Sequence, residues 1–193
     1  MKNVRFFAAA GFILAVFIGV SPALAAGPNY SAFLNKGTWN FGGMISYMSY
    51  GGDLYGSSGM STFSFTPAVK YFITPNLAIG GQVALVTNSE GSDSTTAFGI
   101  GPSAAYFFNV KSERFFPYIG AGFLYMSNSS SWSSNSATGT DIYFGGGMAF
   151  MLSSSLALIA ELTYHIQSLS MSGTSESGHM LALSIGFSAF LHK

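Results

Sequence analysis

The sequence has no cysteine and little charge. Asp, Glu, Lys and Arg make up 7% of its 193 residues, whereas about 25% is usual in a soluble domain. Without cysteine, disulfide bonds, thiolate metal sites and a cysteine nucleophile are excluded. The basic residues are too few and too scattered for the clustered positive face of a nucleic-acid-binding protein. We therefore expect no nucleic acid partner, and no motif indicates a cofactor or a metal.

The longest apolar stretch lies at the N-terminus and predicts a signal peptide. It runs from Phe6 to Val20 behind the positive start MKNVR, and Ala23-Leu24-Ala25 supplies an A-x-A cleavage site. At about 15 residues it falls short of the roughly 20 that a membrane-spanning helix needs. Cleavage after Ala25 divides the chain into a signal peptide (residues 1–25), a short N-terminal segment (26–35) and a single domain (36–193).

The rest of the chain alternates large apolar residues with small or polar ones. In the stretch YFITPNLAIGGQVALV, large residues at 77, 79, 83 and 85 alternate with small or polar residues at 78, 80, 82 and 84. A period of two is typical of a β-strand whose faces meet different surroundings. Eight such segments occur, at 38–50, 60–73, 77–87, 96–108, 115–126, 141–152, 156–167 and 179–190. Each is near the length with which a tilted strand crosses a bilayer.

The connections between these segments alternate between short and long. The links 74–76, 109–114 and 153–155 are short, whereas those after the first, third, fifth and seventh segments are longer and rich in Ser, Gly and Asn. In an antiparallel up-and-down sheet, every short turn then lies at one end and every long loop at the other, as in outer-membrane barrels. The long connections have too few apolar residues to fold alone, so we expect solvated loops.

The two faces of the segments favour lipid outside the sheet. One register holds large apolar residues such as Phe41, Phe144 and Leu183, and the other holds mainly Gly, Ser and Thr. Closing eight strands into a barrel leaves an interior that side chains fill and removes exposed strand edges. A soluble barrel of lipocalin type is the alternative. It would turn the polar register toward water. That register has few of the charged residues that a water-exposed surface needs.

Four stretches resemble a known family: KGTWNFGGMISYMSY, FSFTPAVKYFITPNLAIGGQVAL, AFGIGPSAAYFF and FFPYIGAGFLY. From Lys36 to the C-terminus, the chain resembles the outer membrane protein beta-barrel domain family, which is related to the small OmpA/OmpX-type barrels. The resemblance implies an all-β, eight-stranded, antiparallel up-and-down transmembrane β-barrel, integral to the outer membrane of a Gram-negative cell. Both termini, including segment 26–35, are then periplasmic. The implied partners are outer-membrane lipids and the barrel insertion machinery.

Five inward-facing residues are predicted to form a polar plug in the lumen: Lys70, Gln82, Asp141, Glu161 and His165. Lys70 and Glu161 lie at similar depth above their turns. We predict a buried ion pair between them, because an unpaired charge in the lumen is costly. If the turn 153–155 sets the register, Asp141 lies diagonally across from His165 and makes a polar contact with it.

Pro67 and Pro102 fall in the middle of predicted strands, where each removes a ladder hydrogen bond. One interpretation is a pair of β-bulges that adjust curvature. The other is a lateral opening through which an apolar molecule passes between lumen and bilayer. Its apolar lining would come from inward-facing residues: Met44, Met48, Phe72, Phe107, Tyr118, Tyr143 and Met180.

Sequence motifs for catalysis are missing. GIGPSA at 99–104 fits a dinucleotide fingerprint only nominally, because it lies inside a strand and opens no helix. There is no G-x-S-x-G elbow, Walker loop or H-x-x-x-H pair. His165 and Ser168 lie where a lipid-modifying barrel enzyme would carry its histidine and serine, but three residues apart in a strand they face opposite sides.

We therefore expect a non-enzymatic outer-membrane protein with a structural or surface-interaction role. Trp132, in the longest loop, is the predicted contact for an extracellular partner, because tryptophan often anchors interfaces. The first alternative is a transporter of small hydrophobic molecules with a lateral opening at Pro67 and Pro102. The second is a lipid-modifying enzyme that uses His165.

Overall fold

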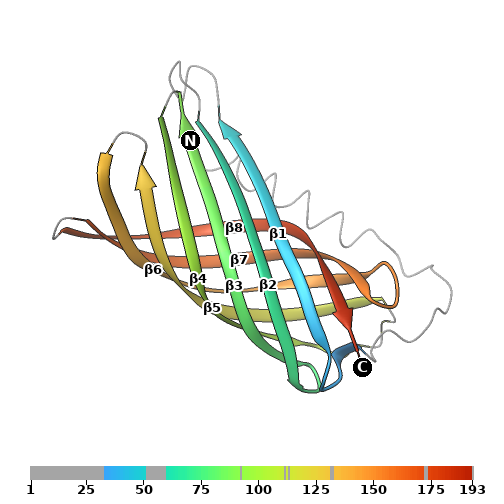
Figure 1. Ribbon diagram of the computed structural model, residues 1–193. Helices are drawn as coiled ribbons and strands as arrows, with labels where there is room; N and C mark the ends of the chain where they lie inside the picture. Colours follow the sequence, from blue (N-terminus) through green and yellow to red (C-terminus); the bar gives the residue numbers. More distant parts are fainter. Residues whose placement is uncertain are drawn as a thin grey trace, which may run out of the picture.

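In the computed structural model, the described part of the chain forms one closed barrel of eight antiparallel strands (Figure 1). The structure describes residues 33–50, 60–91, 93–110, 112, 114–130, 133–171 and 174–192. The predicted signal peptide and Trp132 lie outside these residues. Within them, no helix is long and apolar enough to cross a membrane. The predicted all-β, up-and-down fold is confirmed.

Each strand pairs with its neighbour in sequence, and the last pairs with the first. The strands are β1 (Trp39–Tyr50), β2 (Met60–Thr74), β3 (Leu77–Glu90), β4 (Asp93–Phe107), β5 (Phe115–Ser130), β6 (Ser133–Met151), β7 (Leu156–Met171) and β8 (Thr174–Leu191). We call the end with the connections β2–β3, β4–β5 and β6–β7 the turn end, and the opposite end the loop end.

Most strands are longer than the alternation predicts, and the extra residues lie at the loop end. β5 reaches Ser130 and β6 begins at Ser133, so a stretch expected to be a loop is largely paired strand. The β3–β4 connection is a tight hairpin in which Glu90 pairs with Asp93. The prediction of open loops is wrong for these connections. Their polarity indicates contact with water, but a hairpin in water still pairs its backbone groups internally.

The large apolar residues face outward along the barrel wall. Ile45, Ile185 and Phe187 are 53%, 55% and 57% exposed, while the neighbouring inward residue Ser188 is 6% exposed. The predicted assignment of the two registers is confirmed. It excludes the lipocalin-type alternative, in which these large side chains would fill the interior.

An apolar cluster closes the lumen at the turn end. Phe72, Phe116 and Phe190 point inward and are 0%, 2% and 2% exposed. The ring of Phe72 lies 5.6 Å from that of Phe107 and 6.3 Å from that of Phe190, measured between centroids. Four strands thus contribute aromatic rings to one cluster that fills this end of the lumen.

The segment before β1 packs into the same end of the barrel. Leu34 is 4% exposed and belongs to the apolar cluster, with Phe33 packed against it. The backbone N–H of Asn76, in the β2–β3 turn, donates to the carbonyl of Leu34 at 2.7 Å. Thr38 Oγ1 lies 3.0 Å from His192 Nδ1, so both ends of the described chain meet at the turn end.

Pro67 and Pro102 interrupt the ladder without shifting it. Pairing skips Pro67 on its β3 side and Pro102 on its β5 side, then resumes in unchanged register. The weakened ladder is confirmed, because neither proline has an N–H to donate. The β-bulge interpretation is wrong, since a bulge would shift the register by one residue. The strand pairs β2–β3 and β4–β5 are both hydrogen-bonded on either side of the proline.

β1 and β8 close the barrel over only part of their length. Their pairing ends at Ile45↔Ile185, and residues 46–50 of β1 and 174–184 of β8 make no pairs with each other. Figure 1 shows β1 and β8 diverging toward the loop end. We call this unpaired stretch the β1–β8 gap.

The pairing of β1 with β8 depends on a glycine in β8. A Cβ on Gly186 would overlap the carbonyl oxygen of Gly43 on β1. We expect Gly186→Ala to lower the free energy of unfolding by about 1–3 kcal/mol, the usual cost of overpacking. The matched control in the same strand is Gly178→Ala, where no atom lies within 4 Å of the added methyl. Urea unfolding in detergent micelles measures both, and equal midpoints for the two variants would contradict this packing.

Candidate functional site

The lumen above the apolar cluster contains a cavity of about 170 Å³. All five residues predicted for the polar plug line this cavity: Lys70, Gln82, Asp141, Glu161 and His165. They come from β2, β3, β6 and β7, and each stands in the inward register of its strand. No group of three metal-ligating side chains gathers anywhere in the described part of the chain.

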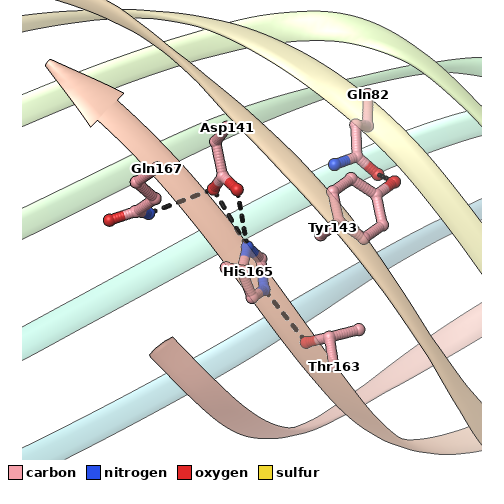
Figure 2. Close-up of polar contacts among 6 residues, drawn as sticks. All are labelled: Gln82, Asp141, Tyr143, Thr163, His165 and Gln167. Atoms are coloured by element: carbon pink, nitrogen blue, oxygen red, sulfur yellow. Dashed lines mark hydrogen bonds and ion pairs between the residues drawn. The ribbon is translucent and has the colours of Figure 1, made fainter. Parts of the chain in front are cut away.

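Asp141 and His165 form a hydrogen-bonded pair in the lumen. His165 Nδ1 lies 2.9 Å from Asp141 Oδ2 and 3.1 Å from Oδ1 (Figure 2). The predicted diagonal arrangement is confirmed, because Asp141 pairs with Gln167, the next inward residue of β7 after His165. Gln167 Nε2 donates to Asp141 Oδ2 at 3.1 Å, and Thr163 Oγ1 lies 3.0 Å from His165 Nε2.

Two tyrosine hydroxyls bind two of the other plug residues, Gln82 and Glu161. Tyr143 donates to Gln82 Oε1 at 2.6 Å, and Tyr118 donates to Glu161 Oε2 at 2.7 Å. The sequence interpretation treated both tyrosines as part of an apolar lining and missed these bonds. The sequence does contain a signal for these bonds. Both tyrosines stand in the inward register, and a buried tyrosine hydroxyl usually finds a polar partner.

The predicted ion pair between Lys70 and Glu161 is wrong. Among the described side chains, no salt bridge joins Lys70 to Glu161, and the Glu161 carboxylate accepts a hydrogen bond from Tyr118 instead. Similar depth brings the two charges near enough to attract each other through space, but not into direct contact. Lys70 is half-buried and lines the cavity.

The fold and the lumen agree with a match to a protein family. A family model described as "Outer membrane protein beta-barrel domain" matches residues 10–188. The chain belongs to this family. It is therefore an outer-membrane β-barrel of the Gram-negative cell envelope. No curated protein matches the chain.

Solved structures share the barrel fold. Neisserial surface protein A is 20% identical, with a TM-score of 0.53 over 79% of this chain and 94% of that one. OprG from Pseudomonas aeruginosa is 13% identical, with a TM-score of 0.52 over 82% of this chain and 98% of that one. At these identities the likeness extends to the fold alone. The outer membrane enzyme PagL also matches, at 12% identity over 78% of this chain and 98% of that one, but its TM-score of 0.40 is too low to bear on activity.

The lumen of this outer-membrane barrel has an apolar turn end and a mixed middle section. The aromatic cluster fills the turn end, and the bonded polar residues lie above it. Leu124 and Met126 are buried in a second apolar cluster, and Met180 also lines the cavity. Leu124 pairs with Asp141 and Met180 pairs with His165, so polar and apolar side chains line the cavity at the same depth.

The two tyrosines offer a matched test of the polar layer. Hydrogen bonds to charged groups contribute about 1.5–3 kcal/mol, against about 0.5–1.5 kcal/mol for neutral pairs. We therefore expect Tyr118→Phe, which strips a donor from the Glu161 carboxylate, to destabilise the barrel more than Tyr143→Phe, which strips one from the Gln82 amide. Urea unfolding of the refolded protein in lipid measures both. Equal losses would mean that Glu161 is not an ionised acceptor.

Proposed function

We propose that the protein exchanges small apolar molecules between its outer mouth and the bilayer through the β1–β8 gap. The main support is the extent of the pairing between β1 and β8. Pairing between the two strands stops at Ile45↔Ile185, while the lumen cavity reaches Ser46 on β1 and Met180 and Ala182 on β8. A molecule in the cavity therefore contacts both edges of the gap.

The energetics of a strand edge in lipid support a lateral route. Leu181 and Leu183 flank the gap and face outward, 54% and 42% exposed, as lipid-facing residues do. Unpaired N–H and C=O groups are costly in hydrocarbon. Water held in the lumen can bond to these groups where the gap meets the cavity. The gap thus joins a hydrated lumen to an apolar surface, which is the arrangement that lateral exchange requires.

The closed turn end supports lateral passage over conduction. Phe72, Phe116 and Phe190 fill the lumen there, so these side chains obstruct the way onward for a solute that enters from the loop end. The β1–β8 gap is then its exit. We place the opening there rather than at Pro67 and Pro102, because the seams that contain the prolines are paired on both sides of each proline.

The proposed orientation places the turn end in the periplasm. Outer-membrane barrels have short periplasmic turns and longer connections outside the cell. Thr38 and His192 lie together at the turn end, so both termini are then periplasmic. The gap opens toward the loop end and faces the outer leaflet.

A surface-interaction role is the second candidate, and the length of the hairpins favours it. β6 and β8 contain 19 and 18 residues, whereas about 9–11 residues cross a bilayer. Figure 1 shows both strands continuing in long hairpins away from the C-terminal end. Paired polar strands present a fixed surface to a partner outside the cell. Trp132, the predicted contact, lies outside the described residues.

Closing the gap covalently tests lateral exchange. The chain has no cysteine, so Ser46→Cys with Ser184→Cys introduces one reactive pair. Continuing the β1–β8 register by one residue places these positions opposite each other. Joined by a disulfide or a short bis-thiol reagent, the variant should take up octane into proteoliposomes no faster than protein-free vesicles do. Reduction of the disulfide should restore uptake.

The control joins two strands that are already paired. Ser46 is paired with Ser64 on β2, and paired strands hold Cα atoms within disulfide range. Ser46→Cys with Ser64→Cys should therefore leave uptake unchanged after oxidation. Undiminished uptake by the variant joined across the gap would rule out this route.

A further inference from the structure

The hydrogen bonds around His165 form a chain that ends on a hydroxyl. His165 Nδ1 contacts both carboxylate oxygens of Asp141, and His165 Nε2 lies 3.0 Å from Thr163 Oγ1 (Figure 2). Gln167 holds the same carboxylate through a bond of 3.1 Å. The ring of Tyr143 stacks against the imidazole, with 5.4 Å between centroids. The imidazole is therefore fixed at both nitrogens and on one face.

The carboxylate determines which nitrogen of His165 carries the proton. An ionised Asp141 only accepts hydrogen bonds, so in the neutral ring the proton lies on Nδ1 and Nε2 keeps its lone pair. The Thr163 hydroxyl then donates to Nε2. Hydroxyl, imidazole and carboxylate stand in the order that activates a nucleophile, an arrangement recognised by geometry and not by sequence spacing. Thr163 and His165 share the inner face of β7, and Asp141 reaches them from β6.

The cavity around this chain suits an ester of an apolar acid. Lys70 lines the same cavity without a direct hydrogen bond or salt bridge among the described residues, and the Glu161 carboxylate attracts it through space. A cation stabilises the negative charge that develops on a carbonyl oxygen under attack, and it also attracts a carboxylate product. Leu124 and Met126 line the same cavity, Leu124 directly beside Asp141, and offer contacts for an acyl chain.

We propose that Thr163, His165 and Asp141 hydrolyse carboxylic esters of small apolar acids inside the lumen. Thr163 Oγ1 attacks the carbonyl carbon while its proton passes to His165 Nε2. The bond to the alcohol oxygen then breaks, and Nε2 returns the proton to the departing alcohol. Water attacks the acyl-threonine in the same way, and the carboxylic acid leaves with Thr163 restored. Asp141 is a positioning residue that holds His165 in the required tautomer.

The direct test uses the refolded full-length mature protein in detergent micelles. Nitrophenyl butyrate reports hydrolysis, and a fluorophosphonate reports the nucleophile, because an activated hydroxyl displaces its fluoride and keeps the phosphonyl group. We expect hydrolysis above the micelle background and a single adduct, mapped to Thr163 by peptide mass spectrometry. No hydrolysis above background, or an adduct on any other residue, would overturn the proposal.

Variants separate chemistry from structural support. Thr163→Val keeps the side-chain shape without the hydroxyl, and we expect a loss of about 10²-fold or more in kcat. Thr163→Ser restores a hydroxyl and should recover most of the rate. Asp141→Asn should lower kcat with little change in KM, since it disturbs the tautomer and not the binding of the ester. A Thr163→Val protein that hydrolyses the ester at the wild-type rate would overturn the assignment.

The route by which a membrane ester reaches Thr163 rests on the proposed exchange through the β1–β8 gap, but the chemistry does not. Nitrophenyl butyrate is soluble enough to enter from the loop end. If hydrolysis is absent while octane uptake depends on an open gap, the hydrolytic assignment fails and lateral exchange stands. If hydrolysis occurs while uptake is unaffected by closing the gap, the exchange fails and the chemistry stands.

Discussion

Backbone hydrogen bonding in hydrocarbon is the constraint on which the rest of this structure depends. No water in the bilayer core can bond to an exposed N–H or C=O group, so a sheet that crosses it has to close on itself. The chain meets this requirement by pairing each strand with its sequence neighbour and the last with the first. The inward register then has to suit a narrow lumen, and small residues such as Gly186 let the strands approach.

The β1–β8 gap gains its importance from the same constraint. β1 and β8 have no hairpin turn to join them, so their pairing relies on the seam between Trp39 and Ile45 on β1 and its partners on β8. Beyond Ile45 the two strands are no longer paired with each other. The lateral exchange that we propose depends on this unpaired stretch, because the lumen cavity reaches residues on both of its edges.

Local pattern was sufficient to predict the wall of the barrel. Alternation of period two gives the strands and their faces, and the tight turn after Met151 gives the register that brings Asp141 to His165. The extension of β6 to Ser133 was not predictable from polarity, because polar residues occur in loops and in solvated hairpins alike. The limit of β1–β8 pairing was not predictable either, since no turn links these strands.

The lumen shows where sequence reasoning stops. Membership of the inward register follows from spacing, so the five plug residues could be placed around one cavity. Their partners could not, because rotamers and intervening strands decide whether Glu161 meets Lys70 or Tyr118. The bond between Thr163 and His165 was not predictable for the same reason. Both residues stand in the inward register, but only the side-chain conformation brings Oγ1 to Nε2.

Amide hydrogen exchange in lipid nanodiscs, resolved by residue, tests the central claim most directly. The account predicts slow exchange for β1 from Trp39 to Ile45, where both edges are paired, and fast exchange at alternate residues from Ser46 onward, where one edge lacks a partner. The same alternation should appear along β8 before Ile185. Uniform protection along both strands would show that the barrel closes completely in the membrane and would contradict the account.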